Sequence, residues 1–108
     1  MSRPKSLKLS QCAAAIVTGA GSGIGRSFAL ELARRGGTVL CVDIQQERAA
    51  QTAAQVDELG GRGIAYTCDV GDEKQFAKLA SKADALLGRA TTVVVNNAGV
   101  GVGGRIGD

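Results

Sequence analysis

The stretch AAAIVTGAGSGIG at residues 13–25 carries an apolar run into a glycine-rich turn, and a helical pattern follows it directly. This order predicts a buried strand, a tight turn and a helix. Glycine in the turn permits backbone angles closed to other residues, and its missing Cβ lets the main chain approach an anion closely. The next helix directs unpaired N–H groups and its positive dipole end to the same place. The stretch therefore predicts a binding site for a nucleotide pyrophosphate.

Length and composition limit what surrounds this stretch. The chain has 108 residues, 44% of them apolar, which suits one small domain with a modest core. Doubly wound dinucleotide-binding domains usually contain more strands than this length holds, so we expect a fragment.

The net charge is only +3, and the three aromatic residues are too dispersed to stack bases. Nucleic acid is therefore not an expected partner.

The cysteines point to a reducing compartment, and the absence of histidine limits metal and nucleophile chemistry. Cys12, Cys41 and Cys68 are odd in number and form no C-x-x-C pair, which predicts buried free thiols. With no histidine, we expect neither a metal site nor a histidine-activated nucleophile. The apolar run before the glycine turn is too short for a signal sequence, so we expect a cytoplasmic protein with no membrane span.

Strand-like and helical patterns alternate after a polar arm at residues 1–11. Apolar runs predict four strands buried on both faces, at residues 13–18, 38–43, 63–68 and 91–96. Helices are predicted at residues 23–35, 46–59 and 72–87, each ending at glycine, with Asp72 as the N-cap of the last. Their predicted apolar positions are Ile24, Phe28 and Leu32, then Ala49, Ala53, Val56 and Leu59, then Phe76, Leu79, Ala83 and Leu86. Lys74, Lys78 and Lys82 predict a solvated face.

Four strands joined by three helices define parallel βαβ units with right-handed crossovers. We therefore expect an α/β fold in which residues 12–108 form a partial Rossmann-like, doubly wound parallel sheet, truncated after about four strands in the order 3-2-1-4. This order reverses between strands 1 and 4, where the carboxyl ends of the strands open a crevice for a ligand. The glycine turn and Asn96-Asn97-Ala98-Gly99 both lie at that point.

The glycine turn also permits an alternative. The plain G-x-G-x-x-G spacing fails, and Ala20 to Ser27 can be aligned with a degenerate phosphate loop in which Arg26 replaces the Walker lysine. Arginine lacks the compact ammonium that reaches the β- and γ-phosphates, and the later residues favour a dinucleotide.

Asp43 ends the second strand, where a carboxylate can accept hydrogen bonds from both ribose hydroxyls and repel a 2′-phosphate. The repulsion is worth about 1 to 4 kcal/mol, so we expect NAD to be preferred over NADP by about tenfold to several hundredfold. No basic residue follows at Ile44, Gln45 or Gln46 to receive the phosphate. A loop acid or a helix N-cap is the structural alternative for Asp43.

Two further strand ends carry polar residues. Asp69 and Val70 end the third strand. We expect the Asp69 carboxylate to accept from an adenine amino group and the Val70 main chain to meet the ring edge, and a simple capping role for Asp69 is the alternative. Asn96 and Asn97 at the fourth strand have amides that must satisfy several donors and acceptors. We expect one to tie neighbouring strands and the other to face the cofactor. A purely structural role for Asn96 stays open.

In this order on alternating strands and helices, Thr18-Gly19-x-x-x-Gly23-x-Gly25, Asp43, Cys68-Asp69-Val70 and Asn96-Asn97-Ala98-Gly99 resemble the first half of a short-chain dehydrogenase/reductase. The resemblance covers residues 13–99. It implies hydride transfer between NAD(H) or NADP(H) and an alcohol or carbonyl substrate. The expected cofactor-binding residues are Gly19, Ser22, Gly23, Ile24, Gly25, Asp43, Asp69, Val70, Asn97, Ala98 and Gly99.

The same resemblance implies catalytic residues that this sequence lacks. In the family a serine positions the substrate oxygen, a tyrosine is the general acid/base, and a lysine four residues later holds the nicotinamide ribose and lowers the tyrosine pKa. Here the only tyrosine, Tyr66, precedes Val70 by four residues and is expected to pack. We expect the 108 residues alone to be inactive and the intact protein to be a homo-oligomeric oxidoreductase. The alternative is a non-catalytic nucleotide-binding or interaction module that exposes apolar sheet surface near strand 4.

Overall fold

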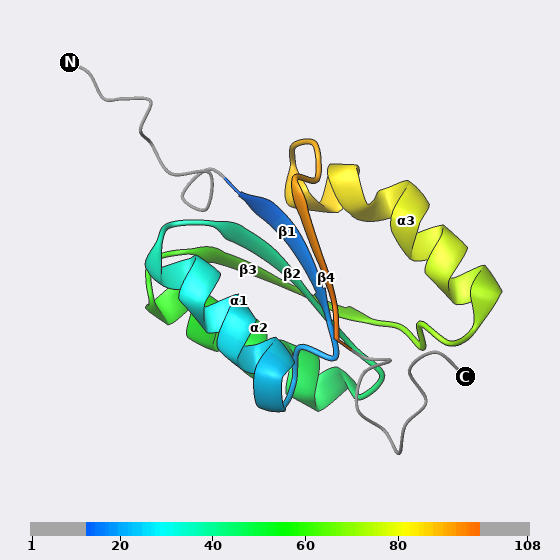
Figure 1. The fold of residues 1–108 in the computed structure, drawn as a ribbon, viewed down its shortest axis with the longest axis horizontal. Helices are drawn as coiled ribbons and strands as arrows, with labels where there is room; N and C mark the ends of the chain where they lie inside the picture. The colour runs from blue at the N-terminus through cyan, green and yellow to red at the C-terminus, as the bar shows by residue number, and fades with distance from the viewer. Residues whose placement is uncertain (1–12, 98–108) are drawn as a thin grey trace.

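Four parallel strands form a single sheet with helices on both faces in the computed structural model, which describes residues 13–97 (Figure 1). The elements in chain order are β1 (Ala14–Thr18), α1 (Gly23–Arg34), β2 (Thr38–Asp43), α2 (Gln46–Glu58), β3 (Arg62–Thr67), α3 (Glu73–Leu87) and β4 (Val93–Asn96). The strand order is β3-β2-β1-β4. The predicted α/β, Rossmann-like topology is therefore confirmed, whereas the predicted arm at residues 1–11 lies outside the described residues.

The register of the sheet brings the carboxyl ends of the strands to one edge. Thr18 at the end of β1 lies opposite Val42 in β2 and Asn96 in β4. Asp43 at the end of β2 lies opposite Thr67 in β3. The loops that follow the four strands therefore start side by side, as the crevice of a doubly wound sheet requires.

Each face of the sheet has its own hydrophobic cluster. Helices α1 and α2 cover one face, and α3 covers the other (Figure 1). Strands β1 and β2 are buried almost throughout, as predicted. The cluster under α1 and α2 consists of Val17, Ala20, Ala29, Ala33, Val39, Cys41, Ala53 and Val56. The cluster under α3 consists of Ala14, Ile16, Leu40, Val42, Cys68, Leu79, Ala83 and Leu87.

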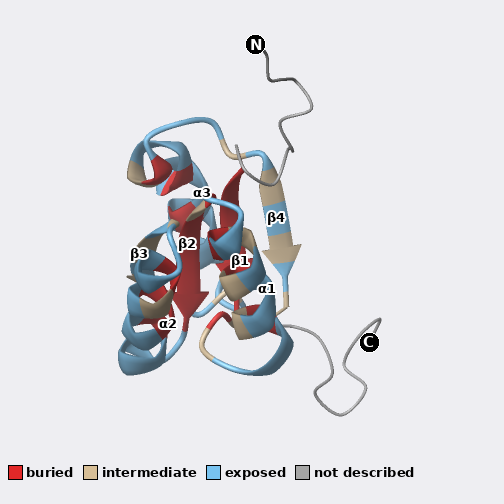
Figure 2. Ribbon diagram, turned by 90° about the vertical axis from the view of Figure 1, so that its left-hand side faces the viewer, coloured by how far each residue is buried: buried red, intermediate tan, exposed pale blue. Residues whose placement is uncertain are grey.

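The prediction that all four strands are buried on both faces is wrong for β3 and β4. Both are outer strands of this sheet, and each of their residues is either partly buried or exposed. The two classes alternate strictly along β4 (Figure 2). Val94 in β4 is 60% exposed. The apolar runs therefore predicted the strands correctly but not their burial, because burial depends on which helices pack over each strand.

The predicted apolar face of α1 is also wrong in part. Ile24 and Phe28 are 63% and 48% exposed, and the helix is buried instead at Gly25, Ala29 and Ala33. These three positions have small or no side chains, so the helix axis can lie close to the sheet. Small residues, rather than the largest hydrophobic ones, define the contact.

The other two helices follow their predicted patterns more closely. In α2, Ala49, Ala53 and Val56 are buried as predicted, while Leu59 after the helix is exposed. In α3, the buried residues are Leu79, Ala83 and Leu87, whereas Phe76 is 42% exposed and Leu86 is partly buried. The predicted solvated face at Lys74, Lys78 and Lys82 is exposed throughout.

Local signals for the ends of α3 are confirmed. The Asp72 side chain accepts hydrogen bonds from the backbone N–H groups of Lys74 and Gln75, which is the geometry of an N-cap. Gly88 ends the helix in the left-handed conformation, at φ 78°. In the described range 13–97, no helix is long and apolar enough to cross a bilayer.

The buried thiols and Tyr66 lie where packing was predicted. Cys41 and Cys68 are free and buried, while Cys12 lies outside the described residues. Burial, with a smaller contribution from the Asp57 carboxylate, raises the pKa of the Cys41 thiol to about 12. Tyr66 is partly buried and packs against the cluster under α3. These side chains therefore contribute to the core.

Candidate functional site

Several glycines shape the turn between β1 and α1, and two of them, Gly23 and Gly25, show different reasons for glycine there. Gly23 has a φ of 54°, and a Cβ there would meet nothing within 4 Å, so this part of the turn faces open space in a conformation that favours glycine. A Cβ on Gly25 would overlap the carbonyl oxygen of Gly19 and lie 2.7 Å from Asn97 Nδ2. Gly25 therefore lets α1 begin in direct contact with the turn, next to the space that Gly23 leaves open.

The first turn of α1 lacks the groups that usually close a helix N-terminus. Ser22 is the N-cap residue, but its side chain makes no capping hydrogen bond, and the first turn contains no acidic residue. The first backbone hydrogen bond of the helix runs from the Arg26 N–H to the Ser22 carbonyl oxygen, at 3.3 Å. The N–H groups ahead of Arg26, at Gly23, Ile24 and Gly25, are therefore available to an anion.

Asp43 lies directly beside this turn. Its Oδ2 accepts a hydrogen bond from the Gly21 N–H at 2.9 Å, and its Oδ1 accepts from the Gln45 N–H at 2.9 Å. The residue is only 7% exposed. Gln45 is the N-cap residue of α2, so the N-cap alternative for Asp43 is wrong, and only the loop-acid alternative stays open. The carboxylate is thus fixed between two loops, and each of its oxygens has a second lone pair for a ligand.

A cavity of about 250 Å³ opens next to Asp43 at the carboxyl edge of the sheet. Its lining residues come from the ends of three strands: Gly19, Val42, Asp43, Ile44, Cys68, Asp69, Val70 and Gly71. Burial, followed by the carboxylates of Asp69 and Asp72, raises the pKa of the Cys68 thiol, so this thiol stays protonated and uncharged at physiological pH. The cavity therefore brings the sequence-predicted Gly19, Asp43, Asp69 and Val70 together.

The two asparagines tie β4 to the glycine turn. Thr18 Oγ1 donates to Asn96 Oδ1 at 3.1 Å, which joins the ends of β1 and β4. Asn97 Nδ2 donates to the Gly19 carbonyl oxygen at 3.3 Å. The predicted strand-tying role of one asparagine is thus observed for Asn96, and the predicted meeting of the two loops is also observed. The remaining predicted residues of this loop, Ala98 and Gly99, lie outside the described residues.

Two residues of α2 that the sequence analysis missed hold the glycine turn and the start of α1. Thr52 is buried, and its Oγ1 donates to the Ala20 carbonyl oxygen at 3.0 Å. The signal was a hydroxyl within the alanine face of a helix, where a buried polar group needs a partner. Gln55 Oε1 accepts from Arg26 Nε at 3.0 Å. This contact commits Arg26 to a neighbouring helix and disfavours the phosphate-loop alternative.

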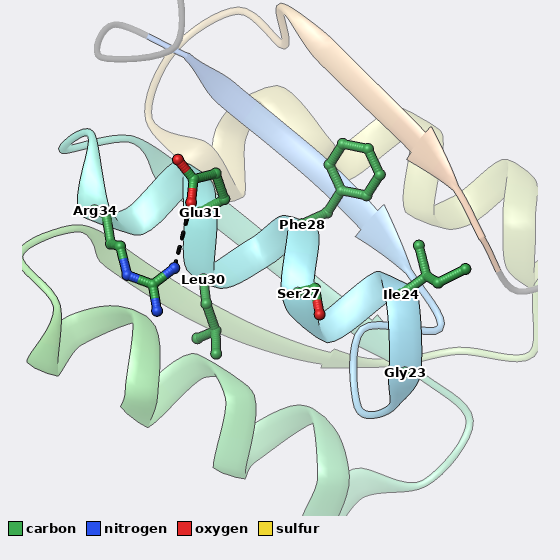
Figure 3. Close-up of a pocket in the computed structure, with 7 residues that line it drawn as sticks. All are labelled: Gly23, Ile24, Ser27, Phe28, Leu30, Glu31 and Arg34. Atoms are coloured by element: carbon green, nitrogen blue, oxygen red, sulfur yellow. Dashed lines mark hydrogen bonds and ion pairs between the residues drawn. The ribbon is translucent and has the colours of Figure 1, made fainter.

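A larger hollow of about 680 Å³ runs along the outer side of α1, and it differs in chemistry from the site above. All of its lining residues belong to α1: Gly23, Ile24, Ser27, Phe28, Leu30, Glu31 and Arg34 (Figure 3). Its charged groups are paired with each other, with Arg34 Nη1 3.3 Å from Glu31 Oε1. Phe28 and Leu30 point to opposite sides of the helix, with Leu30 toward α2 (Figure 3). This hollow is an apolar helix surface rather than a convergent polar site.

Comparison with known proteins agrees with this geometry. The sequence profile of a family described as short chain dehydrogenase matches residues 13–108. The chain belongs to the short chain dehydrogenase family. Over 92 residues it is 42% identical to the probable oxidoreductase EphD of Mycobacterium tuberculosis, which covers 85% of this chain and 15% of that protein. Over 87 residues it is 39% identical to the 7alpha-hydroxysteroid dehydrogenase of Escherichia coli, which covers 81% of this chain and 34% of that protein.

Solved structures show the same family relationship. A 7 alpha-hydroxysteroid dehydrogenase complexed with NADH and 7-oxo glycochenodeoxycholic acid superposes with a TM-score of 0.80 at 36% identity. That alignment covers 90% of this chain and 38% of the other. NAD⁺-bound xylitol dehydrogenase superposes with a TM-score of 0.77 at 32% identity, over 85% of this chain and 35% of the other. The chain spans about a third or less of the length of the curated relatives it matches.

Proposed function

We propose that this chain is the cofactor-binding half of an NAD-dependent oxidoreductase that transfers hydride between the nicotinamide and an alcohol or carbonyl substrate. One observation carries the proposal: the uncapped N-terminus of α1 and the Asp43 carboxylate meet at the Gly21 amide, 2.9 Å from Asp43 Oδ2. A group that carries a diphosphate next to a ribose fits both features at once. Membership in the short chain dehydrogenase family supports the same assignment.

Each part of the cofactor has residues suited to it. The N–H groups at the start of α1, with Ser22 beside them, would hold the pyrophosphate, and the open space at Gly23 leaves room for it. Asp43 would accept from the adenosine ribose. The cavity beyond Asp43 would hold the adenine ring, with Asp69 and Val70 at its edge. Asn97, Ala98 and Gly99 would lie toward the nicotinamide. When bound, the cofactor supplies or accepts the hydride.

Asp43 also supports a preference for NAD over NADP, because a buried carboxylate beside the ribose repels a 2′-phosphate. Asp43→Asn keeps a hydrogen-bond acceptor and removes the charge, and Asp43→Ala removes both. We expect each variant to lower the NADP dissociation constant divided by the NAD dissociation constant at least about tenfold. Calorimetric titration of the full polypeptide with each cofactor measures this ratio. An unchanged ratio in both variants would show that Asp43 does not select the cofactor.

Asp57→Ala is the matched control for Asp43. Asp57 Oδ1 also accepts a backbone hydrogen bond, from the Gly63 N–H at 2.7 Å, but it lies at the other edge of the sheet, where β3 begins. Its removal costs a comparable contact without touching the proposed ribose site. The cofactor ratio is expected to stay at the wild-type value in this variant.

The catalytic half belongs to the proposal as well. We propose that a serine and a Tyr-x-x-x-Lys helix lie in polypeptide beyond Asp108, that the intact protein is a homo-oligomer, and that residues 1–108 alone do not turn over substrate. The downstream coding sequence tests the first point directly. A reading frame that continues without a serine and a Tyr-x-x-x-Lys would overturn the proposed hydride transfer, but it would leave the proposed nucleotide site intact.

A second candidate function is a non-catalytic nucleotide-binding or interaction module. It is favoured by the apolar surface that α1 and β4 expose, with Ile24 at 63% and Val94 at 60%. Such a surface needs a partner to cover it, so this candidate predicts self-association of the 108-residue chain. Sedimentation at increasing concentration measures it. A monomer at high concentration would argue against this candidate.

A further inference from the structure

The loop between β3 and α3 forms one wall of the cavity next to Asp43. Cys68, Asp69, Val70 and Gly71 all line that cavity. Within the loop, Asp69 Oδ1 accepts from the Gly71 N–H at 2.9 Å, and the Asp69 carbonyl oxygen accepts from the Asp72 N–H at 3.0 Å. These bonds turn the chain sharply. They leave Asp69 Oδ2 without a hydrogen bond from any residue of the described chain, 13–97.

Gln75 in the first turn of α3 fixes this loop from outside the cavity. Its Oε1 accepts a hydrogen bond from the Asp69 N–H at 2.9 Å, and its Nε2 donates to Asp72 Oδ2 at 3.3 Å. Its own backbone N–H donates to Asp72 Oδ1 at 3.3 Å. One side-chain amide thus connects the start of the loop to its end, and both to a helix of 15 residues.

This arrangement differs from an ordinary capping box. In a capping box the glutamine at the third helical position returns to the N–H of the N-cap residue. Gln75 is at that position, but it reaches the N–H of Asp69, three residues before the N-cap Asp72. The Asp72 N–H donates instead to the Asp69 carbonyl oxygen. Gln75 Oε1 is therefore left to accept from the Asp69 N–H, and the Gln75 amide ties the loop to the start of the helix.

We infer that Gln75 is a positioning residue for the base of the bound nucleotide. It does not line the cavity, and it acts by holding the Asp69 main chain so that the free carboxylate oxygen of Asp69 and the Val70 main chain meet one edge of the ring. The inference rests on the proposed function, because it takes the cavity as the adenine site. An exposed loop without this clamp would sample several conformations and would distinguish bases poorly.

The test compares NADH with its hypoxanthine analogue, in which the 6-amino donor of the base is replaced by a carbonyl acceptor. Both are titrated calorimetrically into the full polypeptide. We expect wild-type protein to bind NADH about tenfold more tightly than the analogue, because Asp69 accepts from an amino group but not from a carbonyl. Gln75→Met keeps the length and helix propensity of the side chain without its hydrogen bonds. We expect it to reduce the preference to about twofold, mainly by weakening NADH.

Two further variants keep the inference falsifiable. Gln75→Glu retains the acceptor for the Asp69 N–H, and we expect it to restore part of the preference. Asp57→Ala removes the bond to the Gly63 N–H, whose two partners are six positions apart in the sequence, as Gln75 and Asp69 are. We expect this variant to keep the full preference. Full preference in Gln75→Met, or equal weakening of both ligands, overturns the inference and leaves the proposed function intact.

The binding measured for wild-type protein distinguishes a failure of the inference on Gln75 from a failure of the proposed function. Wild-type protein that binds both dinucleotides equally well overturns adenine recognition by Asp69, and the role of Gln75 with it, but keeps a dinucleotide site. Wild-type protein that binds neither overturns the proposed function itself.

Discussion

Helices α1 and α3 both begin at the carboxyl edge of the sheet, yet their first turns are built in opposite ways. Asp72 caps α3 through hydrogen bonds to two backbone N–H groups, and Glu73 adds a negative charge to its first turn. Ser22 at the start of α1 makes no side-chain cap, and no acidic residue follows it. An N-cap is worth about 1 kcal/mol, and a first-turn acid adds up to about 1 kcal/mol.

The difference shows what each helix does at the site. Helix α3 satisfies its own N-terminus, and through Gln75 it holds a wall of the cavity. Helix α1 forgoes a cap, although serine at position 22 has the extended backbone that capping requires. Its positive end therefore remains for a ligand of the opposite charge. The variants below test whether the two N-termini differ in this way.

Gly25→Val is expected to have the largest effect, because it separates α1 from the turn. The new side chain would overlap the Gly19 carbonyl oxygen and press on Asn97 Nδ2. Overpacking of this kind costs about 3 kcal/mol of unfolding free energy, and we expect NADH binding to be lost as well. Urea unfolding and calorimetric titration measure the two effects. Ser27→Val, on the exposed outer side of the same helix, is the control and should preserve both. Wild-type stability in Gly25→Val would show that α1 does not depend on close contact with the turn.

Ser22→Asp is expected to move stability and binding in opposite directions. An aspartate at this N-cap would accept from the open N–H groups and stabilise the free chain by about 0.5 to 1 kcal/mol. The same carboxylate would occupy the proposed pyrophosphate site and repel the ligand, so we expect NADH affinity to fall about 10- to 100-fold. Thermal unfolding and calorimetry measure the pair of effects.

Ser27→Asp adds the same charge beyond the first turn and is the control, with a much smaller loss of affinity expected. The interpretation of α1 as an open anion site would be contradicted if Ser22→Asp bound NADH as tightly as wild type.

Alanine substitution at the two N-caps compares the helices directly. Asp72→Ala removes acceptors for the N–H groups of Lys74 and Gln75, and we expect it to lower the unfolding free energy by about 1 kcal/mol. Ser22→Ala removes a hydroxyl that caps nothing, so a change of less than about 0.5 kcal/mol is expected. Urea unfolding of both variants gives the comparison. Equal losses would mean that Ser22 caps α1 in solution and that the two N-termini are alike.

Much of this arrangement could be predicted from the sequence because its signals are local. Asp72 precedes a helical pattern, so its capping role follows from its position. Asp43 ends a strand next to the glycine turn in the sheet order, so its proximity to that turn follows from topology. In both cases the residue and the element that it serves are set by chain order.

The parts that could not be predicted depend on contacts between distant elements. Hydropathy favoured Ile24 and Phe28 as the buried face of α1, whereas the distance between helix and sheet selected Gly25 and the alanines that follow it. The bond from Thr52 to the Ala20 carbonyl joins residues 32 positions apart, and the reach of Gln75 to Asp69 depends on how the loop turns. No periodic pattern records these partners, because each depends on the packed geometry of two elements.

The smallest expected effect concerns the C-terminal end of α3, which side-chain hydrogen bonds stabilise as they do its N-terminal end. Asp84 Oδ1 accepts from Thr91 Oγ1 at 2.7 Å and from the Thr91 N–H at 2.9 Å, and these bonds lower the pKa of the Asp84 carboxyl below its ordinary 3.8. A lowered pKa in the folded state stabilises the fold above pH 3.8, and this contribution is lost as the pH falls through the folded-state value. Asp84→Asn keeps an acceptor for Thr91 but cannot titrate. We therefore expect wild type to exceed Asp84→Asn in unfolding free energy at pH 6, and the difference to shrink as the pH falls below 3.8, in urea titrations at each pH. A difference that stays constant across this range would show that the link from α3 to the start of β4 does not depend on the charge of Asp84.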